Sequence, residues 1–108
     1  MKIAASEGFI STIVDRIVGR FQPSQVVLFG SHARGTASEW SDVDLLVILP
    51  NVSDKRDAAV NIRRVLGDLP VCKDIVVATP EEIARRGHLP GTVLRSALRE
   101  GKVIYERP

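Results

Sequence analysis

The chain has 108 residues, a length that suits one domain with a single core, and we expect one domain over residues 1–108. Hydrophobic residues make up 44% of the chain and charged residues 26%, which excludes wholesale disorder. The 15 basic and 13 acidic residues are scattered and leave a net charge of only +2. Composition is therefore at most a weak indication of nucleic-acid binding.

Cysteine content and the N-terminal segment exclude further classes. Cys72 is the only cysteine, which excludes an internal disulfide and a cysteine zinc cluster, and we expect it to be a small core residue. Charges at Glu7, Asp15, Arg16 and Arg20 interrupt the apolar N-terminal residues, so this segment is neither a signal peptide nor a membrane span. We expect a cytoplasmic protein without membrane association.

The first half of the chain reads as a helix followed by two strands. Apolar residues recur at helical spacing from about residue 7 to residue 21, which predicts an amphipathic helix before Pro23. VVLFG, residues 26–30, is typical of a buried strand. The polar HARGTASEWS that follows predicts a loop or at most one helical turn, and DVDLLVIL, residues 42–49, is the second strand.

The second half alternates helices with strands. Apolar spacing predicts a helix over residues 58–69, and KDIVVAT, residues 73–79, is the third strand. TPEE, residues 79–82, is a helix-start signature. A last helix spans about residues 93–98, and KVIYE forms a trailing strand or extended tail. The order indicates a small α/β (α+β) domain in which strands 42–49 and 74–78 are parallel neighbours.

Three aspartates stand at the starts of strands. Asp42 and Asp44 are two residues apart, so in a strand both side chains leave the same face, about 6–7 Å apart. Asp74 opens the next strand and can meet them if the registers align. Such oxygen ligands suit Mg²⁺, and a divalent ion would relieve their mutual repulsion. Aspartates that simply mark solvated strand ends are the alternative.

A glycine-serine pair precedes the aspartates and makes the pattern more specific. Gly30 and Ser31 follow the first strand, where a residue without a Cβ lets backbone N–H groups approach a phosphate and a hydroxyl adds a contact. Ten residues separate the pair from Asp42-x-Asp44, and the pattern lies between two apolar strands.

With these residues in view, the chain resembles the minimal nucleotidyltransferases of the DNA polymerase β-like superfamily. The resemblance covers nearly the whole chain: LFGSHARG is similar to the family's glycine-serine turn, SDVDLLV to its acidic strand and KDIVVATPEEI to the strand with the third carboxylate. It implies a mixed sheet flanked by helices and transfer of a nucleoside monophosphate from a nucleoside triphosphate. It also implies that Asp42 and Asp44 bind two Mg²⁺ ions, and that Asp74 shares one of them and helps to activate the acceptor hydroxyl.

Other residues near this turn have open roles. Arg34 could contact phosphate oxygens or could be a solvated loop arginine. His32 could touch nucleotide, and Trp40 could stack on a base, although a hydrophobic anchor is the alternative for Trp40. His88 reads as a loop residue, and no G-x-S-x-G elbow indicates a serine hydrolase.

The resemblance also implies a partner. Larger enzymes of the superfamily add a helical domain, so we expect a second copy or a second polypeptide to complete this site. Minimal nucleotidyltransferases are commonly paired with helical HEPN-domain toxins, which they adenylylate as antitoxins using ATP. A small-molecule (aminoglycoside-type) nucleotidyltransferase and a non-catalytic antitoxin that acts by binding alone are the alternatives, and nucleic acid is not expected to be the acceptor.

Overall fold

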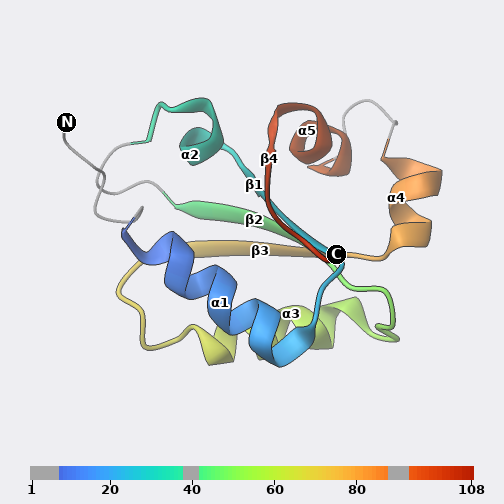
Figure 1. The fold of residues 1–108 in the computed structure, drawn as a ribbon, viewed down its shortest axis with the longest axis horizontal. Coiled ribbons are helices and arrows are strands. Elements are labelled where there is room, and N and C mark those ends of the chain that lie inside the picture. Colours follow the sequence, from blue (N-terminus) through green and yellow to red (C-terminus); the bar gives the residue numbers. More distant parts are fainter. Residues whose placement is uncertain (1–7, 38–41, 88–92) are drawn as a thin grey trace.

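The computed structural model describes residues 8–37, 42–87 and 93–108, which form a four-stranded sheet with helices on both faces (Figure 1). The strands are β1 (Gln25–Phe29), β2 (Val43–Ile48), β3 (Lys73–Ala78) and β4 (Lys102–Glu106). The helices are α1 (Ile10–Phe21), α2 (Ser31–Arg34), α3 (Lys55–Val65), α4 (Pro80–Arg86) and α5 (Val93–Glu100). The α/β class predicted from the sequence is confirmed.

The sheet is mixed, with strand order β3-β2-β1-β4. β1 runs antiparallel to β2 and β4, while β2 and β3 are parallel and are joined through α3. The C-terminal end of β1 and the N-terminal ends of β2 and β3 therefore meet at one end of the sheet, which we call the Gly30 end. The opposite end, where β2 runs out into Leu49, we call the Leu49 end.

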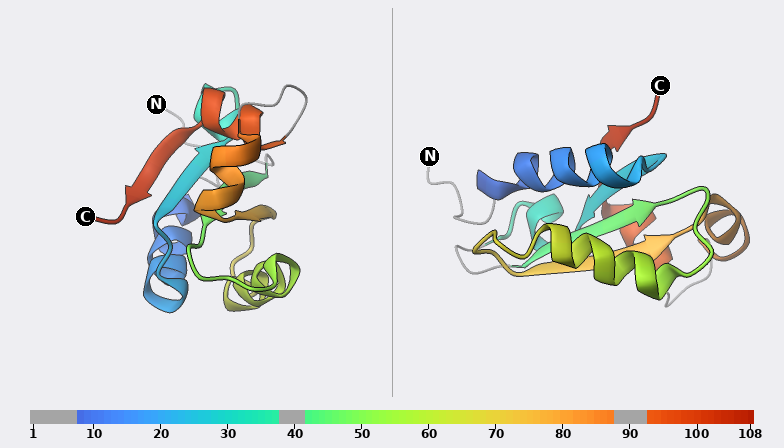
Figure 2. Two further views of the ribbon diagram at one scale, coloured as in Figure 1. Left: turned by 90° about the vertical axis from the view of Figure 1, so that its right-hand side faces the viewer. Right: turned by 90° about the horizontal axis from the view of Figure 1, so that it is seen from below.

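One face of the sheet carries α1 and α3, which lie side by side (Figure 2). Arg16 of α1 ties the two together, because its guanidinium donates to the Val65 carbonyl at 3.0 Å and to the Asp68 carboxylate at 2.5 Å. Each fully buried aliphatic side chain on this face contributes about 1.5–3 kcal/mol. The buried side chains of this face include Ile13 and Ile17 of α1, Ala58, Ile62 and Leu66 of the α3 segment, and Val43, Leu45, Val47, Ile75 and Val77 of the sheet.

The other face carries α5, with α4 beside it (Figure 2). Leu94 and Ala97 pack against Val27 and Leu46 of the sheet. Because side chains alternate along a strand, the residues of β2 that face α5 are the even-numbered ones, and Asp44 belongs to this set. Asp74 belongs to the matching set of β3, whose odd-numbered Ile75 lies in the core of the first face.

Helix starts follow their caps rather than their apolar residues. The Thr79 hydroxyl accepts a hydrogen bond from the Glu82 amide at 3.1 Å, which confirms the predicted start of α4. By contrast α3 begins at Lys55, a turn before the apolar pattern, because the Asp54 carboxylate caps it by accepting from the Asp57 amide at 3.0 Å.

Two predictions from the sequence concern the C-terminal residues 102–106 and the environment of Cys72. Residues 102–106 are a strand paired with β1 rather than a tail. The prediction that Cys72 is a core residue is wrong: it is exposed, because it lies in the turn before β3, where its carbonyl accepts from the Val43 amide at 2.9 Å. In the described part of the chain no helix is both long and apolar enough to cross a membrane.

Candidate active site

The turn after β1 needs a glycine for two reasons. Gly30 has φ 74° and ψ −153°, a conformation that is essentially restricted to glycine. A Cβ atom built on it would also lie 3.1 Å from the Asp44 carboxyl carbon and overlap its Oδ2 atom. The Gly30 carbonyl accepts from the amides of Ala33 and Arg34, both at 3.1 Å, so that α2 forms one helical turn directly over the Gly30 end. The backbone of this turn is thus held against a carboxylate.

Strand register brings two of the three predicted aspartates together. Asp44 pairs with Asp74 across the parallel β2–β3 ladder and with Phe29 across the antiparallel β1–β2 ladder. Neighbouring strands lie about 4.8 Å apart, so the two aspartates are direct neighbours on the face that also carries α5. Asp42 stands immediately before β2 and is exposed, as is Asp74, whereas Asp44 is half-buried.

The charge on Asp44 is disfavoured by its surroundings. Partial burial, together with the negative charges of Asp74 and then Asp42, raises the pKa of Asp44, and the nearby His32 and Arg34 side chains offset part of that rise. Asp42, Asp44 and Asp74 therefore interact electrostatically at the Gly30 end. Their carboxylates repel one another in the absence of a cation.

The donor chemistry of this cluster fits a hard divalent cation. Within residues 8–37, 42–87 and 93–108, no three His, Cys, Asp or Glu side chains are already gathered into a metal-binding group. Mg²⁺ does not require such a cage, because it is usually held by one or two carboxylates together with water and substrate phosphates. The absence of a side chain at Gly30 leaves room beside the Asp44 carboxylate for a phosphate.

The other predicted residues surround the turn. Ser31 is the first residue of α2 and is half-buried, and His32 is buried, with 6% of its surface exposed. The Arg34 side chain is 51% exposed, and its Nη1 atom lies 3.7 Å from Oε2 of Glu100 at the end of α5. Trp40 and His88 lie outside the described residues.

Residues 10–104 match the family model described as a nucleotidyltransferase domain. The chain belongs to this nucleotidyltransferase family. Over 44 residues the nucleotidyltransferase is 52% identical to a Methanocaldococcus jannaschii protein named "Putative protein adenylyltransferase MJ1305". That match covers 41% of this chain and spans 28% of the length of the relative.

Solved structures share the fold of this nucleotidyltransferase. A structure described as a "putative nucleotidyltransferase from Sulfolobus solfataricus" has a TM-score of 0.65 and 21% identity, covering 99% of this chain and 91% of the other. A toxin–antitoxin structure with AMP-PNP has a TM-score of 0.63 and 20% identity, covering 91% of this chain and 74% of the other. These likenesses confirm the mixed-sheet polymerase β-like fold.

One contact at the site has no sequence signal. The ion pair between Arg34 and Glu100 joins α2 to α5, two elements far apart in the chain. Glu100 belongs to no motif, and only the packing of α5 against the sheet places it near Arg34. The closeness of Asp44 to the Gly30 turn, by contrast, follows from the glycine-serine and aspartate spacing once β1 and β2 are taken as antiparallel neighbours.

Proposed function

We propose that this nucleotidyltransferase acts in the cytoplasm as one domain over residues 1–108 and transfers AMP from ATP to a hydroxyl group of a helical HEPN-type protein partner. The observation that carries the proposal is the alignment of Asp44 with Asp74 beside the Gly30 turn. It makes a surface where carboxylates and phosphate-binding backbone lie together at one end of a sheet. The protein would be the antitoxin of a HEPN/MNT toxin–antitoxin pair.

The nucleotide side of the site is formed by the Gly30 turn and α2. With no Cβ at Gly30, the triphosphate can lie against the backbone, and the Ser31 hydroxyl donates to a phosphate oxygen. The Arg34 guanidinium, on the outer side of the same turn, pairs with phosphate oxygens as a fork of donors. These three residues orient the α-phosphate toward the acceptor.

Asp42, Asp44 and Asp74 would hold two Mg²⁺ ions. When bound, these ions neutralise the triphosphate and lower the pKa of the attacking hydroxyl. The raised pKa of Asp44 supports this role, because a carboxylate that is partly buried beside other carboxylates gains most from a nearby cation.

In the transfer step, the acceptor hydroxyl oxygen bonds to the α-phosphorus while the bond from that phosphorus to the oxygen bridging to the β-phosphate breaks. Pyrophosphate leaves, and the Asp74 carboxylate accepts or orients the hydroxyl proton. The Asp68 carboxylate instead pairs with Arg16 of α1.

A protein acceptor is supported by the relatives. The relative that is 52% identical over 44 residues is named "Putative protein adenylyltransferase MJ1305". A toxin–antitoxin structure shares the fold. An acceptor surface that completes the site would confine transfer to the complex. A phosphate charge and a base added to the toxin would block its functional surface.

The test of the reaction uses ATP labelled at either the α- or the γ-phosphate, with Mg²⁺ and the HEPN-type partner. Label from the α-phosphate should appear on the partner, and label from the γ-phosphate should not. Label on an added aminoglycoside but not on the partner would favour the small-molecule enzyme instead.

A second arm separates modification from neutralisation by contact. The partner is co-expressed with this protein, separated under denaturing conditions, refolded and assayed for toxicity or ribonuclease activity. Covalent modification predicts that inhibition persists. Full recovery of an unmodified partner, together with neutralisation by the Asp42, Asp44 and Asp74 to Asn variant, would favour the contact-only antitoxin.

A further inference from the structure

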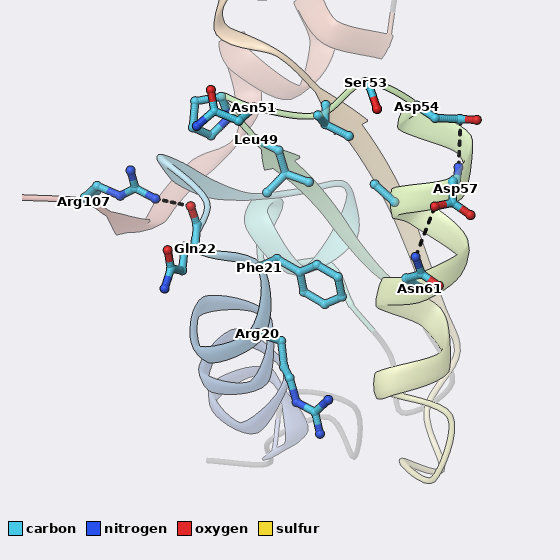
Figure 3. A pocket seen from close by; sticks show the side chains of 13 residues that line it. Arg20, Phe21, Gln22, Leu49, Asn51, Ser53, Asp54, Asp57, Asn61 and Arg107 are labelled. Carbon is cyan, nitrogen blue, oxygen red and sulfur yellow. Dashed lines mark hydrogen bonds between the residues drawn. The ribbon is translucent and has the colours of Figure 1, made fainter.

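A polar cavity lies at the Leu49 end of the sheet (Figure 3), and none of Asp42, Asp44 and Asp74 lines it. It measures about 480 Å³, is open to solvent on one side, and is bordered by the last turn of α1, the connection over residues 49–54, the first turns of α3 and Arg107. Its volume falls within the range of about 300–1,000 Å³ that is typical of small-molecule sites. None of the residues proposed for nucleotide transfer lines it.

One wall of the cavity is apolar. Phe21 is half-buried against the core, and Figure 3 shows its ring directed from α1 toward α3. Leu49 and Ala58 are 6% and 9% exposed, and Val52 is half-buried beside them. An apolar side chain placed here would be covered by an aromatic ring and aliphatic groups.

Charges of opposite sign stand on the two helices. Arg20, in the last turn of α1, forms no ion pair or side-chain hydrogen bond within the part of the chain that the structure describes, whereas Arg107 donates to the Gln22 carbonyl. On α3, the Asp57 carboxylate accepts from the Asn61 amide at 3.4 Å (Figure 3). Asp57 and Asn61 keep further acceptor capacity toward the cavity.

We propose that this cavity binds the carboxylate end of an apolar amino-acid residue. The carboxylate pairs with Arg20, the neighbouring N–H group donates to Asp57 or Asn61, and the apolar side chain lies on Phe21 and Leu49. The cavity does not favour a triphosphate, because the charges of Asp54 and Asp57 balance those of Arg20 and Arg107 and leave no excess of positive charge. The same chemistry is offered by a free amino acid and by the C-terminus of a polypeptide.

Three probes distinguish these sources by isothermal calorimetry and amide chemical shifts. L-leucine carries a carboxylate and an ammonium, N-acetyl-L-leucine mimics a chain terminus, and L-leucinamide lacks the carboxylate. We expect both carboxylate probes to bind and to shift the amides of Phe21 and Asn61, and leucinamide to bind at least about tenfold more weakly. The tighter of the two carboxylate probes identifies the source.

Matched variants test the assignment of Arg20. Arg20→Gln should weaken both carboxylate probes about tenfold or more, because it removes a charge-assisted hydrogen bond. Arg63→Gln changes an exposed arginine of α3 that does not line the cavity, and it should leave the affinity unchanged. Neither variant should alter AMP transfer, so the binding result is independent of the proposed reaction.

Several outcomes would overturn the proposal. The first is that neither carboxylate probe binds up to its solubility limit. The second is that leucinamide binds as tightly as leucine. The third is that Arg63→Gln weakens the carboxylate probes as much as Arg20→Gln does. Asp57→Asn adds a directional test, since removal of its charge should weaken leucine, with its ammonium, more than N-acetyl-leucine. If Asp57→Asn weakens the binding of the two probes equally, Asp57 does not contact the ammonium group and the proposed contact is wrong.

Discussion

At the scale of single residues, the proposed active site leaves no room for a side chain between Gly30 and Asp44. Gly30→Ala would force a methyl group into the Asp44 carboxylate. It would also strain a backbone with positive φ, and this strain lowers the free energy of unfolding by about 1–3 kcal/mol. We expect transfer to be abolished and the Tm to fall by several degrees. Transfer assays and thermal melts measure the two effects.

The control for Gly30→Ala is Gly35→Ala. Gly35 also has positive φ, 77°, but no atom lies within 4 Å of a Cβ built on it. This variant should therefore lose stability, by about 1 kcal/mol, without losing transfer. Equal loss of activity in the two variants would mean that backbone strain, rather than displacement of Asp44, is responsible.

Asp44 also predicts a pH dependence. Its folded-state pKa is raised above the ordinary value of 3.8, so the ionised carboxylate destabilises the fold at neutral pH, and this cost disappears as the pH falls through the folded-state pKa. Since interactions at partly exposed sites amount to less than about 1 kcal/mol, Asp44→Asn should raise the Tm by about 2–5 °C at pH 7 without metal. The gain should shrink as the pH falls through the raised folded-state pKa and should be gone below the ordinary value of 3.8, while transfer is lost at all pH values.

Melts of Asp15→Asn, which replaces an exposed aspartate of α1, serve as the control. A Tm gain for Asp44→Asn that is constant across the pH range would contradict the electrostatic origin.

Asp74 is expected to act in chemistry more than in nucleotide binding. Asp74→Asn should lower turnover by about 100-fold or more, which is the usual range for a group that assists proton transfer. In calorimetry with Mg²⁺, the same variant should change the ATP affinity by less than about threefold. Unchanged turnover would show that another group takes the proton.

At the scale of elements, α5 reaches the proposed active site through Glu100, which pairs with Arg34. The Glu100 carboxylate lies 3.7 Å from the Arg34 guanidinium, and both side chains are about half exposed. Because such pairs are worth about 0.2–1 kcal/mol, Glu100→Gln should tighten ATP binding by about 1.4- to 5-fold as Arg34 becomes available to phosphate. The control, Glu106→Gln on the edge strand β4, should leave ATP affinity unchanged. If Glu100→Gln instead weakens ATP binding, Glu100 positions Arg34 for the phosphates rather than competing with them for it.

Elements with a clear hydrophobic period were predictable from the sequence. The apolar runs of β1 and β2 and the cap of α4 at Thr79 are local signals, and the structure confirms them. The start of α3 at Lys55 was missed because its first turn is polar, and Cys72 was misplaced because a residue type says little about a position in a turn. The Arg34–Glu100 pair arises only from tertiary packing.

At the scale of the whole molecule, the mixed sheet separates the two proposed sites. Antiparallel β1 and parallel β3 bring the Gly30 turn, Asp44 and Asp74 together at one end of β2, and the cavity beside Phe21 lies at the other end. A toxin could thus be modified at the Gly30 end while the Leu49 end remains open to a second ligand.

Intact mass of the partner tests the central claim most directly. The HEPN-type partner is incubated with this protein, ATP and Mg²⁺, and its mass is compared with that obtained with the Asp42, Asp44 and Asp74 to Asn variant. We predict a gain of one or more adenylyl groups with the unaltered protein only, and none when ATP or Mg²⁺ is omitted. An unmodified partner that is nevertheless bound and neutralised by the unaltered protein would contradict the account.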